Sequence, residues 1–248
     1  MRTKQSIAML GCAFALIGAT MVALAQETTP PGQPAAGATA APTTEERVAA
    51  IKTHLALSAQ NLKQYAWTET MVVTLKGEDK SHAQNNCSYG ADGKVVKTPV
   101  AAPAEGKDKP GLRGKIVEKK KEEMGEYMQS AVALLKTYIP PDPARIQAAK
   151  DAGKVSLTVL EPGKRARVDI KDYEKPGDNL GIEIDMTTNQ ILGIKVASYL
   201  TDAKDAVTLS VAMANLPDGT GYPASVTLDG VKEQIRVAIS NGEYKKKS

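Results

Sequence analysis

Apolar and polar residues alternate along residues 181–200, GIEIDMTTNQILGIKVASYL, with a polar interruption in the middle. The apolar positions of the two halves are Ile182, Ile184, Met186, Leu192, Ile194 and Val196. Glu183, Asp185 and Lys195 lie between them. A period of two is typical of a strand with one buried and one solvated side, so this stretch predicts a β-hairpin with one apolar face. That face either packs against an ordinary core or lines a cavity for a hydrophobic molecule, because both use the same residue types.

The same period of two recurs along the chain and predicts a sheet of about nine strands. The predicted strands and hairpins cover residues 65–76, 81–90, 94–100, 155–170, 181–200, 206–213, 222–228 and 233–240. Turns are predicted at Asp92-Gly93, Pro162-Gly163 and Asp229-Gly230, while Asn241-Gly242 either ends the last strand or begins a short edge strand. Sequential strands joined by such short turns are antiparallel.

Two long segments and one short segment have helical spacing instead. Residues 44–63 carry one apolar stripe, and Thr43 with Glu46 has the spacing of a capping box. Residues 115–139 carry a second stripe that ends before two prolines. A short helix is predicted between Asp142 as its N-cap and Gly153. Helices and an antiparallel sheet together predict an α+β domain.

The first 42 residues are predicted to lie outside the folded domain. Residues 1–25 combine a basic start, an uncharged apolar run and a small-residue cleavage site, which predicts an export signal. An uncleaved membrane anchor is the alternative, and a lipoprotein signal at Gly11-Cys12 fits poorly because the apolar run continues well beyond Cys12. Residues 26–42 are rich in Pro, Ala and Thr and predict a flexible linker. We therefore expect one domain over residues 43–244 and a basic tail over residues 245–248, without a stable transmembrane anchor after cleavage.

Charge and composition exclude some partners. The whole chain has 32 basic and 28 acidic residues, and removal of residues 1–25 brings the two closer still. Such near-balance argues against nucleic acid as a partner, and the mature chain is too poor in aromatic residues for a base-stacking platform. Cys87 is the one cysteine outside the signal, so no internal disulfide is expected, and the thiol is interpreted as a small strand residue.

The sequence offers little catalytic chemistry. Its two histidines, His54 and His82, have no metal-ligand spacing with Cys87, and no G-x-S-x-G motif is present. His54 is predicted on the exposed side of its helix. Glu183 and Asp185 share one face of a strand, where the solvated side of the sheet explains them as well as acid–base chemistry does. We predict no catalytic residue, no metal and no cofactor, so the protein is not interpreted as an enzyme.

The candidate site is therefore the apolar face itself. If it lines a cavity, residues of the predicted strands should face the apolar stripe of the long helix across one space. The candidate ligand-lining residues are Met124, Met128, Leu135, Ile184, Ile194, Leu209, Val211 and Met213.

The order of these elements resembles a known family. An export signal, an amphipathic helix, strands that start at YAWTETMVV, internal helices and then a meander with IEIDMTTNQILGIKV are similar to periplasmic lipoprotein carriers of the LolA/LolB type and their lipid-binding relatives. The resemblance implies an incomplete antiparallel β-barrel wrapped around or capped by two to three helices. It also implies that the chain binds a lipid or a lipoprotein acyl chain in the exported space, which is the periplasm if the cell has an outer membrane and the outside otherwise.

Three functional classes follow from these patterns. The first is an exported, non-enzymatic binder or carrier of a hydrophobic ligand. The second is an envelope interaction or assembly protein whose helices pack the sheet solid and leave no room for a small ligand. An enzyme is the third and has the least support. Nothing in the pattern specifies the ligand or the oligomeric state.

The mature chain is predicted to start at Gln26, because Ala23-Leu24-Ala25 forms the small-residue cleavage site. N-terminal sequencing of the exported protein measures this directly. An intact N-terminus, or an acyl group on Cys12, would contradict the prediction.

Overall fold

The computed structural model describes residues 43–100 and 112–247. The predicted signal and linker, the predicted loop over residues 101–111 and the last residue lie outside the described residues. None of the helices that the structure describes is long and apolar enough to cross a membrane.

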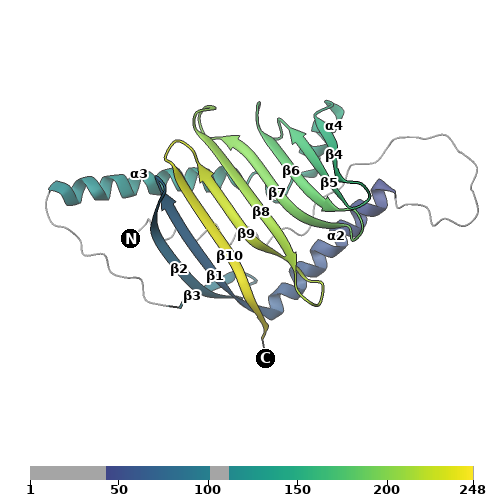
Figure 1. Cartoon of the computed structure of the whole chain (residues 1–248), viewed down its shortest axis with the longest axis horizontal. Coiled ribbons are helices and arrows are strands. Elements are labelled where there is room, and N and C mark those ends of the chain that lie inside the picture. Colours follow the sequence, from purple (N-terminus) through teal and green to yellow (C-terminus); the bar gives the residue numbers. More distant parts are fainter. Residues whose placement is uncertain (1–42, 101–111, 248) are drawn as a thin grey trace, which may run out of the picture.

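Ten strands form a single antiparallel sheet (Figure 1). Their bounds are β1 Tyr65–Leu75, β2 Glu78–Tyr89, β3 Val95–Pro99, β4 Val155–Glu161, β5 Arg165–Lys171, β6 Asn179–Asp185, β7 Gln190–Tyr199, β8 Ala206–Asn215, β9 Gly221–Gly230 and β10 Ile235–Lys246. The spatial order is β3-β2-β1-β10-β9-β8-β7-β6-β5-β4, so β1 pairs with the last strand and β3 and β4 form the two edges. The predicted antiparallel, incomplete barrel is confirmed as an open, curved sheet. Its ten strands correspond to the predicted strand and hairpin ranges, one more than the approximate count of nine.

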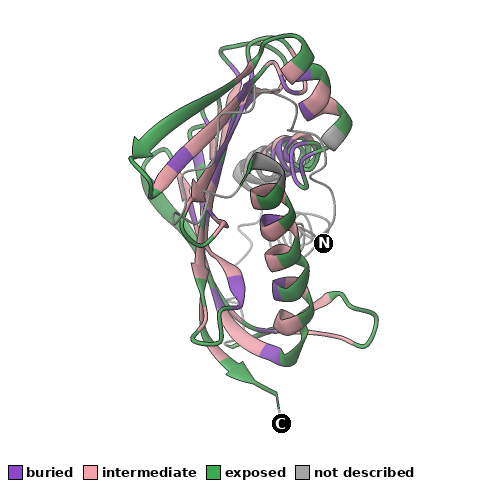
Figure 2. Cartoon of the chain, turned by 90° about the vertical axis from the view of Figure 1, so that its right-hand side faces the viewer, coloured by how far each residue is buried: buried purple, intermediate pink, exposed green. Residues whose placement is uncertain are grey.

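The helices lie on the concave side of this sheet (Figure 2). They are α2 Thr44–Asn61, the 3-10 turn η2 Leu62–Gln64, α3 Leu112–Leu135 and α4 Pro143–Asp151. The predicted capping box is present at α2: Glu46 N–H donates to Thr43 Oγ1 at 3.2 Å, and Thr43 N–H donates to Glu46 Oε2 at 2.7 Å. Asp142 caps α4 by accepting from Ala144 N–H at 2.8 Å. The opposite face of the sheet carries no helix of the described residues.

The turns follow the prediction only in part. Pro162-Gly163 forms the β4–β5 turn, in which Lys164 N–H donates to Glu161 O at 3.0 Å and Gly163 has the positive φ of +70° that glycine favours. The predicted turn at Asp229-Gly230 is wrong, because both residues belong to β9 and the chain turns over residues 231–234. Asp229 is held in the ladder by Arg236, whose Nε donates to Asp229 Oδ1 at 2.6 Å.

Two further predicted strand ends differ from the structure. The Asp92-Gly93 turn is longer than two residues, since Gly90 N–H donates to Lys94 O at 2.8 Å and closes the loop there. Asn241-Gly242 neither ends a strand nor starts a new one. β10 continues through both residues to Lys246, because β1 pairs with it beyond a local irregularity.

The opening hairpin forms β6 and β7 with one correction to its alternation. Ile182, Ile194 and Val196 are buried, as predicted for the apolar side. The register shifts between Glu183 and Ile184, so Ile184 pairs with Ile191. This irregularity leaves Ile191 buried in place of Leu192, because one extra residue in a strand reverses the side on which the following side chains point.

An exposed carboxylate joins the start of β1 to the turn between β8 and β9. Tyr65 Oη donates to Asp218 Oδ2 at 2.6 Å, and Thr220 N–H donates to Asp218 Oδ1 at 3.1 Å. The hydrogen bond from Tyr65, followed by those from Thr220, lowers the pKa of Asp218 from 3.8 to about 2. A depressed carboxyl pKa means that the charged form stabilises the fold.

The stabilisation from Asp218 should therefore be lost in acid. It is present above the unfolded pKa of 3.8 and disappears as pH falls through the folded value of about 2. Asp218→Asn should lower the melting temperature at neutral pH, and its difference from wild type should narrow between about pH 4 and pH 2. Tyr65→Phe removes the main cause of the shift and should move the acid transition to higher pH. Thermal melts across this range measure both effects, and a constant Asp218→Asn difference down to pH 2 would refute the assignment.

Candidate functional site

The eight candidate residues belong to, or pack against, one apolar cluster on the concave face of the sheet. Five of them belong to a single buried cluster: Met128, Leu135, Ile194, Leu209 and Val211. The other three, Met124, Ile184 and Met213, are partly buried and pack against that cluster. The structure thus brings together residues from α3, β6, β7 and β8. A role in lining a ligand stays a prediction.

The interface is tightly packed in this conformation. Met128 and Ile194 are each 1% exposed, and Leu135 is 4% exposed. Ala131 and Val132 of α3 fill the same cluster, and Ile51 of α2 and Ile146 of α4 extend it along the concave face. A ligand on this face would therefore have to displace a helix, because the helices already make the apolar contacts that it would make.

The middle of α3 contacts the sheet through Tyr127, whose ring lies directly over Gly230. A Cβ atom at Gly230 would lie 2.6 Å from the ring, so only glycine permits this approach. Tyr127 Oη and Asp205 Oδ1 are both buried and neighbour each other, but neither makes a hydrogen bond of good geometry among the described residues. Burial, and then the nearby Asp205 carboxylate, raise the pKa of Tyr127. A buried polar atom without a well-formed hydrogen bond costs about 1–3 kcal/mol, so this part of the contact is imperfect.

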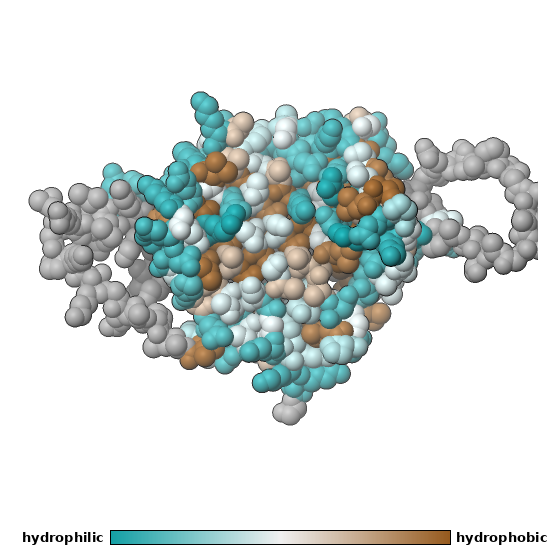
Figure 3. All heavy atoms as spheres, viewed as in Figure 1, coloured by the Kyte–Doolittle hydropathy of each residue, from teal (hydrophilic) through white to brown (hydrophobic). Residues whose placement is uncertain are grey.

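An open depression of about 430 Å³ lies on the other, outer face of the sheet. It is bordered by Arg167, Asp169, Asn179, Gly181, Lys195, Val196, Ala197, Thr208, Leu209 and Ser210. Gly181 keeps it open, since a Cβ atom there would stand 3.3 Å from Asp169 Oδ1. Charged residues gather mostly toward the margins of this face, around a centre of smaller and apolar residues (Figure 3). The sequence pattern does not predict this depression, because a glycine at an outward strand position is its only local signal.

The paired carboxylates of β6 serve separate structural contacts. Glu183 accepts from Arg165 Nη2 at 3.1 Å and from Lys195 Nζ at 3.4 Å. Asp185 Oδ1 instead accepts from Thr187 Oγ1 at 2.6 Å and Thr187 N–H at 2.7 Å, and the Thr187 hydroxyl is the first cause of its lowered pKa. Both interactions fit the solvated side of a sheet, as predicted.

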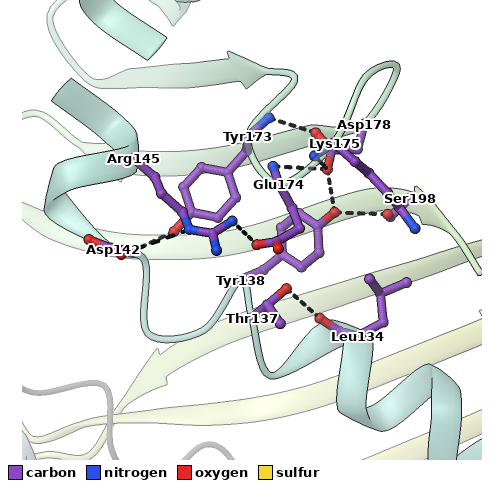
Figure 4. A network of polar contacts seen from close by, with 10 residues as sticks. All are labelled: Leu134, Thr137, Tyr138, Asp142, Arg145, Tyr173, Glu174, Lys175, Asp178 and Ser198. Carbon is purple, nitrogen blue, oxygen red and sulfur yellow. Dashed lines mark hydrogen bonds and ion pairs between the residues drawn. The ribbon is translucent and has the colours of Figure 1, made fainter. Parts of the chain in front are cut away.

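A buried polar network holds the β5–β6 turn against the chain that leaves α3 (Figure 4). Asp178 is 2% exposed and accepts from the backbone N–H groups of Tyr173 at 2.6 Å, Lys175 at 2.9 Å and Glu174 at 3.1 Å. The hydroxyl of Tyr138 also donates to Asp178 and lies 2.8 Å from Ser198 Oγ. The carboxylate is therefore saturated by donors, which makes it a structural anchor with no acceptor capacity left for a substrate.

The same network extends to α4. Asp142 N–H donates to the Tyr173 hydroxyl at 2.5 Å, and Arg145 pairs with Glu174. The Arg145 guanidinium also lies 5.9 Å from the Tyr173 ring centroid. Because both Tyr138 and Tyr173 are buried, burial is the first cause that raises the pKa of each. These contacts fix where α3 ends and α4 begins relative to the sheet.

A second polar group lies on the concave face toward the β3 edge. Glu69 is 3% exposed and accepts from Lys97 Nζ at 2.6 Å and 2.7 Å and from Asn85 Nδ2 at 3.3 Å. Beside it, Trp67 stacks on Tyr244 with ring centroids 5.6 Å apart. The sequence pattern does not predict this ion pair, because the alternation of β1 places Glu69 at a position that otherwise predicts an apolar residue.

Among the described residues, His54 and Cys87 give little support for catalysis or metal binding. His54 is not on the exposed side of α2 as predicted; its Nε2 lies 3.5 Å from Ser58 Oγ, and burial lowers its pKa. The reason is that α2 packs this side against β9, where Gly221 N–H donates to Ser58 Oγ at 2.9 Å. Cys87 is a buried thiol, 1% exposed, that donates to Asn85 O at 3.8 Å. No cluster of His, Cys, Asp and Glu in the described residues has the arrangement of a metal site.

Comparison with known proteins gives only distant likenesses. No protein-family model matches the sequence, and no curated protein matches it. A LolA superfamily protein from Nitrosomonas europaea superposes with a TM-score of 0.34 at 8% identity, over 80% of this chain and 94% of that one. A DUF1329 family protein from Desulfovibrio piger gives 0.30 at 11% identity, over 79% and 92%. The lipoprotein LppX from Mycobacterium tuberculosis gives 0.28 at 13% identity, over 83% and 98%.

A LolA superfamily protein is thus among the matched structures, as the sequence resemblance predicted. With TM-scores below 0.5 and identities of 8–13%, these likenesses assign neither a family nor a function to this chain.

The Tyr138 hydroxyl should contribute to stability more than an exposed tyrosine does. Tyr138→Phe removes a buried donor to Asp178 and should lower the free energy of unfolding by about 1–3 kcal/mol. Tyr199→Phe is the matched control, since its hydroxyl donates to Pro176 O at an exposed position, 2.9 Å away. Urea unfolding measures both. Equal losses in the two variants would contradict the structural role of the network.

Proposed function

We propose that this protein is an exported, non-enzymatic binder or carrier of a long-chain hydrophobic ligand, such as a lipid or a lipoprotein acyl chain. The observation that carries the proposal is the aliphatic cluster on the concave face, to which α3, β6, β7 and β8 all contribute buried side chains. An acyl chain makes the same non-directional contacts as the side chains of Met128 and Leu135, so it could take their place on the sheet.

The size of the ligand follows from the cost of uncovering α3. Exposing the three large buried aliphatic side chains of α3, Met128, Val132 and Leu135, costs about 4.5–9 kcal/mol. Each newly buried methylene contributes about 0.8 kcal/mol. A chain of roughly eleven or more methylenes is therefore needed to replace the helix. This favours long acyl chains over short ones and over small apolar molecules.

The contact at Tyr127 supports movement of α3. Tyr127 Oη and Asp205 Oδ1 are buried without a hydrogen bond of good geometry when the helix lies on the sheet, and water can satisfy both when it leaves. The exported location rests on the predicted signal over residues 1–25. A location in the cell envelope is part of the proposal, since carriers of acyl chains are needed where lipids cross water.

A solid-core interaction protein is the second candidate. The low exposure of the candidate residues favours it, since Met128 and Ile194 are each only 1% exposed. The two functions differ in one property: whether α3 can leave the concave face while the sheet stays folded.

Binding of a fluorescent fatty acid, an anthroyloxy-labelled stearic acid, separates the two candidates. Val211→Phe adds bulk to the proposed ligand surface. If α3 can leave the concave face, this variant should keep a near-normal free energy of unfolding and bind the probe several-fold more weakly than wild type. If the core is solid, the same change should cost about 1–3 kcal/mol of unfolding free energy. Val231→Phe is the control, because Val231 is 56% exposed on a turn.

Gly230→Ala provides the converse variant. Its added Cβ meets the Tyr127 ring and should push α3 from the sheet, so probe binding should become faster or tighter than in wild type. Gly242→Ala is the matched control in β10, since a Cβ there meets nothing within 4 Å. Absence of probe binding in wild type and in Gly230→Ala, together with no lipid in native mass spectrometry, would favour the solid-core protein.

A further inference from the structure

The outer edge of β4 is unpaired within the part of the chain that the structure describes. β4 is the last strand of the sheet and pairs with β5 on its other side. It forms the right-hand margin of the sheet in Figure 1, so this edge faces the viewer in Figure 2, with the helices to one side. An edge of this kind presents a row of free backbone donors and acceptors to any strand that approaches it.

The register identifies which backbone groups face outward. Lys171 N–H donates to Lys154 O at 3.0 Å, which makes these two residues a hydrogen-bonded pair at the start of the ladder. Hydrogen-bonded and non-bonded pairs alternate along antiparallel strands, so Ser156 and Thr158 turn their backbone groups toward β5. Leu157 and Val159 therefore direct their N–H and C=O groups away from the sheet.

The side chains of the same two residues are apolar and exposed. Leu157 pairs with Val168 and Val159 with Ala166, which places both on the concave side. Their exposed fractions are 63% and 61%, among the largest of the apolar residues in the described chain. No charged residue occurs from Val155 to Leu160. The edge thus combines free backbone groups, apolar side chains and no charge.

The opposite edge has the protection that β4 lacks. β3 is only five residues long, Val95–Pro99, and contains Lys97 and Pro99. A proline removes a donor, and a lysine on an edge strand opposes pairing with another chain. An edge strand without proline or lysine is therefore found at β4 and not at β3.

We propose that β4 pairs antiparallel with β4 of a second copy of this chain, around a two-fold axis at Thr158. In that register Leu157 pairs with Val159 of the second copy, and Val159 with its Leu157. Val155 pairs with Glu161, and Ser156 with Leu160. All seven residues of the strand are then paired.

The chemistry of the strand selects a second copy as the occupant. The sequence VSLTVLE places apolar residues opposite apolar residues when it is reversed about its centre, and its one charged residue, Glu161, meets Val155 and not another carboxylate. Self-pairing therefore opposes no like charges and covers the exposed Leu157 and Val159 of both copies. The result is an isologous dimer in which two concave faces join across the shared edge.

Sedimentation velocity of the full exported chain, from low micromolar to submillimolar concentration, tests the dimer. It needs no ligand, so its outcome is independent of the proposed lipid binding. Wild type should show a concentration-dependent dimer. The double variant Leu157→Lys with Val159→Lys places like charges opposite each other and should dimerise about tenfold or more weakly. The double variant Leu157→Glu with Val159→Glu should behave in the same way.

Mixing the two double variants tests the register. Each lysine then opposes a glutamate, so a mixed dimer should form, and salt should weaken it. Val96→Lys, at a residue 52% exposed on the other edge, is the control and should leave dimerisation unchanged. Circular dichroism of the double variants should match wild type, since both positions are exposed. If either fails to fold, Leu157→Thr with Val159→Thr keeps the β propensity and should still weaken the dimer.

Three outcomes would overturn the proposal. A wild-type chain that stays monomeric at every concentration removes the dimer. A dimer that survives in both double variants must use another surface. Double variants that do not dimerise alone and also fail when mixed exclude the antiparallel register about Thr158.

Discussion

One face of the sheet is apolar from β1 to β5, and the fold depends on keeping that face from water. Buried positions on it include Ile170, Leu180, Ile194, Leu209 and Val237, each at most 2% exposed. Burial of apolar area is the dominant favourable term in folding, and a single curved sheet cannot bury its own face. The helices therefore all lie on the concave side, and the other side is left to charged and small residues.

The helices cover this face by two different kinds of contact. The chain between α3 and α4 is tied to the sheet by directional bonds, above all those of Tyr138 and of the saturated Asp178. The body of α3 contributes apolar side chains such as Met128 and Leu135, together with a tyrosine whose hydroxyl is buried without a hydrogen bond of good geometry. Directional bonds specify one position, whereas apolar contacts can be replaced by another apolar surface of similar area. This difference is the physical basis of the proposal that α3 yields to an acyl chain while its C-terminal end remains anchored.

An open sheet also has two edges, and this chain treats them differently. β3 is short and carries Lys97, which is bonded to the buried Glu69, and Pro99. β4 is uncharged over its first six residues and exposes Leu157 and Val159. The concave face thus reaches the surface at β4 without a charged border, so association through that edge would extend the same apolar face into a second copy.

Much of the local structure was determined by the sequence itself. The period of two defined the strands, the Thr43–Glu46 spacing defined the start of α2, and the stripe of Met124, Met128 and Leu135 defined the apolar side of α3, because these signals act over a few residues. Only the tertiary structure decided the bulge that buries Ile191, the turn beyond Gly230, the ion pair of Glu69 and the outer depression at Gly181, since each depends on which strands become neighbours. The pairing of β1 with β10, which joins residues far apart in the sequence, is of the same kind. The tertiary structure also decides whether the apolar face is a core or a binding surface. Both use the same residues, and they differ only in whether a covering helix can move.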